Sequence, residues 1–227
     1  MTSKSTIRAI ICGHTGATGS ALINVLTALP ECESIVAVGR RENLDHLNNP
    51  KLKQYVFDNM FELSTIQPNI ANGCNFAFCC IGTTFNDVFK KSKADEYKSV
   101  DFVIATEFAK MAKLANVEFF AIITGDKSDS NSQFRMTRVK GETEDFVTSL
   151  GFSRVAILRP GLLNRGKGRR GWLEQLLTVG GIFGIPVRQL AQSMVWMSQS
   201  QTEAVKRYET VDIRKAIESF ESSKVNY

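Results

Sequence analysis

The chain has 227 residues, of which 43% are apolar and 22% charged. This balance excludes a disordered or fibrous protein and allows one α/β domain with a sizeable core. Lys and Arg outnumber Asp and Glu by 28 to 23, and a net charge of +5 is too small to indicate nucleic-acid binding.

The sequence carries no sign of a membrane span or a leader. No apolar run reaches the ~20 residues that a span requires, and a strand-like segment that starts by Ile7 leaves no room for a signal peptide. We expect a cytoplasmic protein, with mitochondrial import without a recognisable presequence as the alternative.

The first forty residues predict a strand, a tight turn, a helix and a second strand. Residues 6–12 are short, apolar and β-branched, and glycines and a helical pattern that Pro30 ends follow them. The second buried strand pattern covers residues 34–38. Further strand candidates lie at residues 54–57, 75–81, 117–123 and 154–158. Their alternation with loops and helices predicts one α/β domain with a doubly wound parallel sheet, Rossmann-like in its order.

Two helical patterns stand out in the middle of the chain. Residues 93–116 carry one apolar stripe at three- and four-residue steps, and residues 134–150 form a second helix that contains Lys140. From about residue 160 onward, glycines interrupt short apolar pieces, and we expect a small C-terminal cap at the carboxyl edge of the sheet. Helical patterns in this part cover residues 189–197 and 213–220.

A glycine-rich motif, GHTGATG at residues 13–19, directly follows the first strand and opens the helix. Glycines allow a tight turn and close approach of a ligand, while the free amides at the helix start can hold a pyrophosphate. In this context the motif predicts a dinucleotide-binding turn. The residues assigned to the cofactor here are Gly13, Thr15, Gly16, Ala17, Thr18 and Gly19.

Two arginines follow the second strand, at the position where an NAD-selective protein usually has a carboxylate for the ribose 2′-hydroxyl. The planar guanidinium groups of Arg40 and Arg41 suit a 2′-phosphate, so the pattern favours NADP(H) over NAD(H). The alternative is that both are solvated loop charges and that Glu42, beside them, touches the ribose.

Several motifs together resemble one known family, the Tat-interacting-protein family of atypical short-chain dehydrogenase/reductase proteins. The resemblance covers roughly residues 6–200, and the combination is more specific than any single piece. Its motifs are GHTGATG, GRR at 39–41, FCCIGTT at 78–84, VKGETE at 139–144 and RPGLL at 159–163.

The resemblance implies further contacts with a nicotinamide nucleotide. It places Asp58, after the third strand, at the adenine amino group. It places four residues along the adenosine ribose, namely Cys80, Ile81, Gly82 and Thr83, and three at the border of the nicotinamide, namely Pro160, Gly161 and Leu162.

The chemistry of this superfamily rests on a Tyr-x-x-x-Lys pair on one helix face and on a serine at the end of the preceding strand. Lys140 fits the lysine, but the residue four positions before it is Met136, whose thioether cannot donate a proton. The serine position falls at Thr124 or Gly125, and Thr124 could supply a hydroxyl. None of the four tyrosines has a lysine four residues later.

Two main functional hypotheses follow. The first is an NADP(H)-binding, catalytically impaired relative of these reductases that acts as a scaffold, a sensor or a subunit of a larger assembly, because Met136 replaces the acid. The second is an active NADPH-dependent oxidoreductase that reduces a small carbonyl substrate and receives its proton through Thr124, Lys140 or water. A site without its general acid can retain slow hydride transfer through proximity.

The remaining polar features are less specific. The two histidines, His14 and His46, lie far apart in sequence without metal-ligand spacing, so we expect no metal site and no role for them. The five cysteines are expected to be reduced. A basic stretch could bind a phosphorylated ligand, an acidic protein surface or an RNA backbone, or could be a solvated loop. Its residues are Arg165, Lys167, Arg169 and Arg170.

Overall fold

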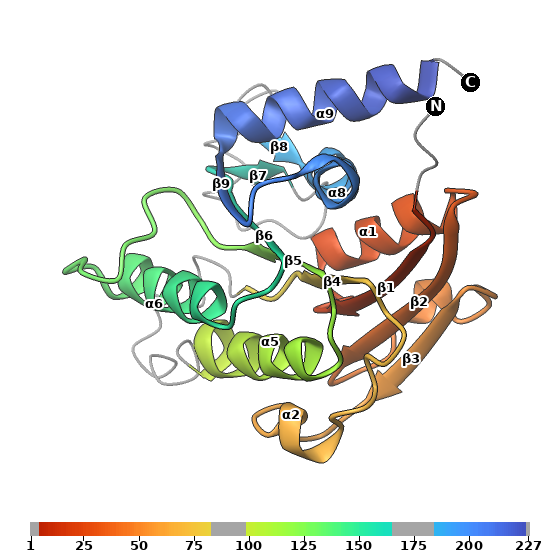
Figure 1. Cartoon of the computed structure of the whole chain (residues 1–227), viewed down its shortest axis with the longest axis horizontal. Helices are drawn as coiled ribbons and strands as arrows, with labels where there is room; N and C mark the ends of the chain where they lie inside the picture. Colours follow the sequence, from red (N-terminus) through yellow and green to blue (C-terminus); the bar gives the residue numbers. More distant parts are fainter. Residues whose placement is uncertain (1–4, 83–98, 165–183, 226–227) are drawn as a thin grey trace.

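The computed structural model describes residues 5–82, 99–164 and 184–225, and a central parallel sheet dominates this part of the chain (Figure 1). Seven strands follow the order β3-β2-β1-β4-β5-β6-β9, and every neighbouring pair is parallel. The order reverses between β1 and β4, the kind of switch point where such sheets bind ligands. The strands are β1 (Ile7–Cys12), β2 (Cys32–Gly39), β3 (Leu52–Val56), β4 (Phe76–Cys79), β5 (Phe119–Ile123), β6 (Arg154–Arg159) and β9 (Val205–Glu209).

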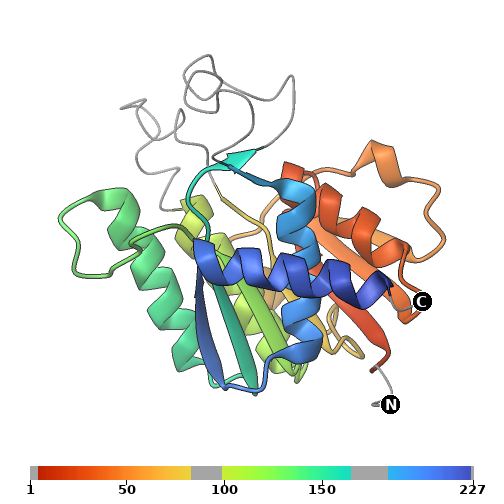
Figure 2. The ribbon, with the colours of Figure 1, turned by 90° about the horizontal axis from the view of Figure 1, so that it is seen from above.

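Helices cover both faces of the sheet, which confirms the predicted doubly wound fold (Figure 1). On one face lie α1 (Ala17–Thr27), α8 (Val187–Ser200) and α9 (Thr210–Val225). On the other lie α2 (Leu63–Ile66), α5 (Ala105–Leu114) and α6 (Arg135–Ser149). A π-helical turn at Ser99–Ile104 leads into α5, and a 3₁₀ turn at Leu44–His46 joins β2 to β3. Figure 2 shows α9 crossing α8 on its face of the sheet.

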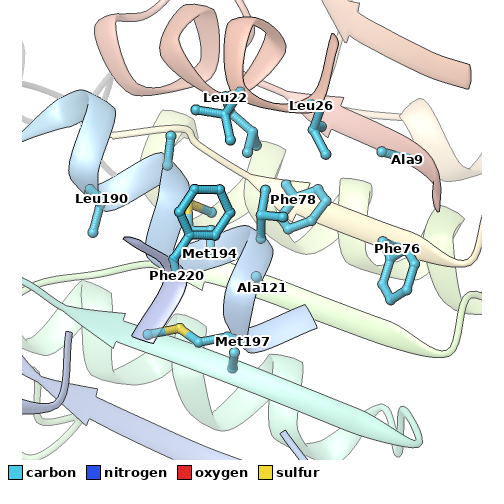
Figure 3. Packing of buried hydrophobic residues seen from close by; sticks show 14 of the residues in the cluster. Ala9, Leu22, Leu26, Phe76, Phe78, Ala121, Leu190, Met194, Met197 and Phe220 are labelled. Atoms are coloured by element: carbon cyan, nitrogen blue, oxygen red, sulfur yellow. The ribbon is translucent and has the colours of Figure 1, made fainter. Parts of the chain in front are cut away.

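The core consists of one apolar cluster on each face of the sheet. In the first cluster, Leu22 and Leu26 of α1 face Met194 of α8, with Phe78 of β4 beneath them (Figure 3). All four side chains are fully buried, and each contributes roughly 1.5–3 kcal/mol through removal of apolar surface from water. This packing fixes α1, and with it the glycine-rich turn that precedes α1.

Most predicted elements are confirmed within a few residues, but one strand of the seven-stranded sheet is not predicted by the sequence pattern. The stripe over residues 93–116 is helical as α5 and its preceding π turn, and residues 93–98 lie outside the described part. The strand that the pattern does not show is β9, which pairs with β6 and ends the sheet. Its sequence, VKRYE, is largely charged because a strand at the sheet edge exposes much of its surface.

The structure describes only part of the segment that was expected to form a C-terminal cap. A two-stranded sheet of β7 (Leu163–Asn164) and β8 (Ile185–Pro186) lies in that region, and residues 165–183 are outside the described ranges. The segment from 187 onward instead extends the main domain, because α8 packs against α1 and β9 joins the sheet.

Helix α6 contains a glycine, Gly141, where helix propensity would favour alanine, and close backbone packing explains it. A Cβ atom at this position would overlap the backbone of Asp129 and Ser130, in the loop that precedes the helix. The glycine therefore lets α6 lie directly against the β5–α6 loop.

We predict that Gly141→Ala lowers the free energy of unfolding by about 1–3 kcal/mol, as overpacking does, although the same change in an open helix stabilises by about 1 kcal/mol. The matched control is Gly161→Ala, because the nearest contact of its Cβ would be Thr210 Oγ1 at 3.6 Å. Urea unfolding of both variants measures the difference. A Gly141→Ala variant as stable as the wild type would show that the loop moves aside.

Candidate functional site

In the turn between β1 and α1, the backbone packs closely against itself and against the backbone that follows β4. Gly13 has a φ of +85°, and a Cβ there would lie 2.7 Å from the carbonyl carbon and oxygen of Cys80, at the end of β4. A Cβ at Gly19 would overlap the carbonyl oxygen of Gly13. The N–H of Gly16 donates to that same oxygen at 3.0 Å. Only glycines fit at positions 13 and 19 of this turn.

The N-terminus of α1 is open to an anion. No side chain caps it, and its first turn has no acidic residue. The N–H groups of this turn and the positive end of the helix dipole therefore face the carboxyl edge of the sheet, and no capping side chain accepts a hydrogen bond from these N–H groups. This is the geometry in which a phosphate or pyrophosphate binds.

A cavity of about 170 Å³ lies beside this turn, between the carboxyl ends of β1, β2 and β4. It joins the glycine-rich turn to both predicted arginines and to the residues after β4. Its walls also include apolar side chains for which the sequence patterns predicted no role. The lining residues are Cys12, Gly13, His14, Thr15, Gly16, Gly39, Arg40, Arg41, Met60, Cys80, Ile81, Gly82, Val100 and Ile104.

Arg40 and Arg41 reach the cavity from an exposed turn at the end of β2. Gly39, just before them, makes room for a side chain beneath the turn, because a Cβ there would lie 2.7 Å from Cε1 of His14. The cavity therefore combines an uncapped helix start with two guanidinium groups, and its polar ends favour a ligand with more than one phosphate.

The two histidines, for which the sequence indicated no role, form part of one buried polar cluster under the cavity. Nδ1 of His14 donates to the carbonyl oxygen of Val38 at 3.2 Å, and Asn43 Nδ2 donates to the carbonyl oxygen of His14 at 2.8 Å. Ser20 Oγ and His46 Nε2 are hydrogen bonded at 3.1 Å. Burial lowers the pKa of His14, and the neighbouring His46 lowers it further. The cluster joins the glycine-rich turn and α1 to the loop that carries both arginines.

The second part of the site lies at the ends of β5 and β6. Lys140, on α6, donates from Nζ to the carbonyl oxygen of Thr124 at 2.8 Å. The Thr124 hydroxyl donates to Oε1 of Glu144 at 2.7 Å and lies in the protein interior. The position that faces Lys140 is instead Gly125, where a Cβ would lie 3.3 Å from Nζ. Of the two candidates for the serine position, the one beside the lysine therefore has no hydroxyl.

Met136 lies on the first turn of α6, one helical turn before Lys140, so the two side chains share a face of the helix. The two tyrosines in the described ranges lie elsewhere: Tyr55 is on β3, and Tyr208 on β9 donates its hydroxyl to Gln201 Oε1 at 3.2 Å. Burial raises the pKa of Tyr208 to about 12. Neither replaces the acid beside Lys140.

The turn after β6 borders this part of the site. Pro160 is buried, and Gly161 and Leu162 after it are exposed. The Gly161 N–H donates to Thr210 Oγ1 at 3.1 Å, which ties the turn to the start of α9.

Several predicted contacts lie outside the cavity or outside the described ranges. Ala17 and Thr18 form the first turn of α1, and Asp58 is exposed after β3 and is not among the lining residues. Thr83 and the basic stretch at residues 165–170 are not described. Their roles remain predictions.

The cysteines are free thiols, as expected, and burial raises the pKa of Cys79 to about 12. Within the described ranges no group of His, Cys, Asp and Glu side chains could hold a metal ion. No helix there has the length and apolar character needed to cross a membrane.

Two relatives are similar in sequence to this chain over most of its length. Protein FMP52-1, mitochondrial, of Scheffersomyces stipitis is 30% identical over 222 residues, which cover 90% of this chain and 96% of the relative. Protein HTATIP2 of Rattus norvegicus is 30% identical over 171 residues, or 73% of this chain and 67% of the relative. The chain belongs to the HTATIP2 and FMP52 family. This confirms the resemblance to Tat-interacting proteins, although no protein-family model matches the chain.

Solved structures of other proteins have the same fold as this member of the HTATIP2 and FMP52 family. MoeE5, in complex with UDP-glucose and NAD, has a TM-score of 0.68 at 12% identity over 95% of this chain and 81% of that one. Bordetella bronchiseptica WbmF, in complex with NAD⁺, has a TM-score of 0.67 at 12% identity over 97% and 79%. A Burkholderia thailandensis oxidoreductase of the short-chain dehydrogenase/reductase family has a TM-score of 0.65 over 94% of each chain. At these identities the likeness shows the fold alone.

We predict that the free energy of unfolding falls as the pH is lowered from 7 to 5, in part through His14. Its pKa in the folded chain lies below the usual histidine value of 6.5, so at pH values below 6.5 the unfolded chain binds a proton more readily than the folded chain does. This contribution is fully present above pH 6.5, and below it the loss has a slope of at most about 1.4 kcal/mol per pH unit.

The measurement is urea unfolding at several pH values for the wild type and His14→Asn. The variant is expected to show the shallower pH dependence, whatever its stability at pH 7. Parallel curves for the two proteins would contradict the assignment of this proton to His14.

Proposed function

We propose that the chain binds NADP(H) and that its capacity for carbonyl reduction is impaired, so that it acts through its nucleotide-bound state as a scaffold, a sensor or a subunit of an assembly. The observation that carries this proposal is the cavity that joins the glycine-rich turn to Arg40 and Arg41. The NAD and NADH complexes of the structural neighbours support a nicotinamide nucleotide in this position of the fold.

The described residues offer groups that suit the separate parts of such a nucleotide. The glycines at 13 and 19 let the backbone of the turn pack closely on itself and on the end of β4, and the uncapped start of α1 supplies N–H groups for the pyrophosphate. Met60 and Ile81 offer apolar walls near Arg40 and Arg41 that suit the adenosine half. Lys140 and the turn at 160–162 are then available to the nicotinamide ribose and ring.

Bound NADPH would supply a hydride to a carbonyl carbon, and the protein would have to deliver a proton to the carbonyl oxygen. In short-chain dehydrogenases, a tyrosine and a serine hydroxyl perform this task. Here Met136 and Gly125 occupy the corresponding positions beside Lys140, and neither side chain carries a hydroxyl. The Thr124 hydroxyl is engaged with Glu144. The site therefore keeps its binding groups while its proton donors are absent.

The second candidate function is an active NADPH-dependent reductase of a small carbonyl compound. The observation that favours it is Lys140, which remains in place and is held at 2.8 Å from the Thr124 carbonyl oxygen. Water bound near this ammonium group would then deliver the proton. Rapid NADPH oxidation by the wild type with an aldehyde or ketone, abolished by Lys140→Ala, would establish this function instead.

The mitochondrial names of the FMP52 relatives favour the mitochondrion over the cytoplasm as the site of action. We propose this location together with the nucleotide function. Fractionation of cells that produce the tagged protein tests it.

Arg40→Ala is predicted to weaken NADPH binding without a comparable change for NADH. Loss of a charge-assisted hydrogen bond to the 2′-phosphate costs about 1.5–3 kcal/mol, roughly a ten- to hundredfold loss of affinity. Isothermal titration calorimetry measures both nucleotides, and Arg188→Ala, an exposed arginine on α8, is the control. Equal losses for both nucleotides would remove the assignment of NADP(H).

The double variant Gly125→Ser, Met136→Tyr is predicted to gain NADPH-dependent carbonyl reduction by about 10²-fold or more, the usual contribution of a positioned general acid. A serine fits at 125 because only the flexible Lys140 side chain lies within 4 Å of the added Cβ. The assay is NADPH oxidation across a panel of aldehydes and ketones.

The matched control is Gly125→Ala, Met136→Phe, which adds the same bulk without the hydroxyls. A gain in the first variant and none in the control identifies the hydroxyls as the lost groups. No gain in a folded double variant that still binds NADPH would refute this reason for the impairment.

A further inference from the structure

Glu144 is a buried carboxylate that four hydrogen bonds hold in place. It lies on α6 with a relative exposure of 1%. Arg159 donates from Nε to Oε1 at 3.0 Å and from Nη2 to Oε2 at 2.6 Å, so the pair is bidentate. Arg207 Nε on β9 donates to Oε2 at 3.3 Å, and the Thr124 hydroxyl donates to Oε1 at 2.7 Å. No sequence pattern predicted a function for this residue.

The first arm of this network leads to Lys140. Thr124 is held on both sides, because its hydroxyl binds Glu144 while its carbonyl oxygen accepts the Lys140 ammonium at 2.8 Å. Its N–H donates to the carbonyl oxygen of Leu158 at 2.9 Å, so it also joins β5 to β6. Lys140 and Glu144 are one helical turn apart on α6, and Thr124 bridges them. The hydroxyl contact anchors Thr124 to α6, and a shift of the Thr124 backbone would move the carbonyl oxygen that accepts the Lys140 ammonium.

The second arm leads to the turn that borders the reacting end. Arg159 is the last residue of β6 and directly precedes Pro160. Its Nη2 also donates to the Ser128 carbonyl oxygen at 3.0 Å, and its Nη1 pairs with Glu209 at 3.2 Å. The hydrogen bond with Glu144 raises the pKa of Arg159, which keeps this guanidinium charged. Glu144 thus fixes the direction in which the chain leaves β6.

Stability alone is a weak reason for a buried ion pair, because an apolar replacement of similar shape often stabilises a protein as well. Three of the four hydrogen bonds of Glu144 belong to the two arms, which end at Lys140 and at the 160–162 turn, while the fourth, from Arg207, joins α6 to β9. None of Glu144, Thr124, Lys140 and Arg159 lines the cavity beside the glycine-rich turn. Any effect of Glu144 on a bound nucleotide should therefore be confined to one half of that nucleotide.

We propose that Glu144 is a positioning residue for the nicotinamide half of the bound nucleotide. It holds Thr124, and through it the Lys140 ammonium, and it holds Arg159, and through it the 160–162 turn. This inference rests on the proposed binding of NADP(H). It assigns the network a role in nucleotide binding that persists although the proton donors at 125 and 136 are absent.

The test compares a whole and a half nucleotide. Glu144→Gln keeps the shape of the side chain and removes its charge, and affinities for NADPH and for adenosine 2′,5′-bisphosphate are measured by calorimetry. NADPH affinity is expected to fall about tenfold, the size of one charge-assisted hydrogen bond, while the affinity for the bisphosphate stays unchanged. Glu142→Gln, on the same helix and partly exposed beside Arg138, is the control and is expected to change neither.

Thr124→Val provides a second, milder variant, because it removes only the hydroxyl that Glu144 accepts. It is expected to lower NADPH affinity in the same selective way and by a smaller factor. Losses that are equal for both ligands, or no loss for NADPH in either variant, would overturn the positioning role while the proposed function stands. A wild type that binds neither ligand would overturn the proposed function, and this inference with it.

Discussion

The close contact between two stretches of backbone, Gly13 after β1 and Cys80 after β4, is the constraint on which the site depends. With a Cβ at Gly13, the two strand ends could not approach as they do. Because the approach occurs where the strand order reverses, it places the glycine-rich turn, the arginine turn of β2 and the end of β4 around one cavity. The apolar packing of α1 against α8 then holds the turn in this position (Figure 3).

The site has two ends that differ in what they retain. At the β1–β2 end, the uncapped helix start and the guanidinium groups of Arg40 and Arg41 lie around one cavity, and both kinds of group attract phosphate. At the β5–β6 end, Lys140 is held in a hydrogen-bonded framework, whereas the neighbouring positions 125 and 136 carry no hydroxyl. Strong binding and weak chemistry are therefore compatible in one fold, because different strands build the two ends.

Local sequence patterns predicted the elements and the turn, since a buried strand, glycines and an amphipathic helix lie next to one another in the chain. The contacts that decide the chemistry depend on residues that lie far apart in sequence. No spacing rule brings His14 to His46, or Glu144 to Arg207. Likewise β9 is charged enough to resemble a loop, and only its pairing with β6 makes it a strand.

The most direct measurement is the identity of the nucleotide that the purified protein retains. The protein is incubated with equal concentrations of NADPH and NADH, freed of unbound ligand and denatured, and the released nucleotide is analysed by mass spectrometry. We expect the nucleotide with the 2′-phosphate, NADPH, to be recovered in excess. Recovery of NADH in its place, or of no nucleotide at all, would contradict it.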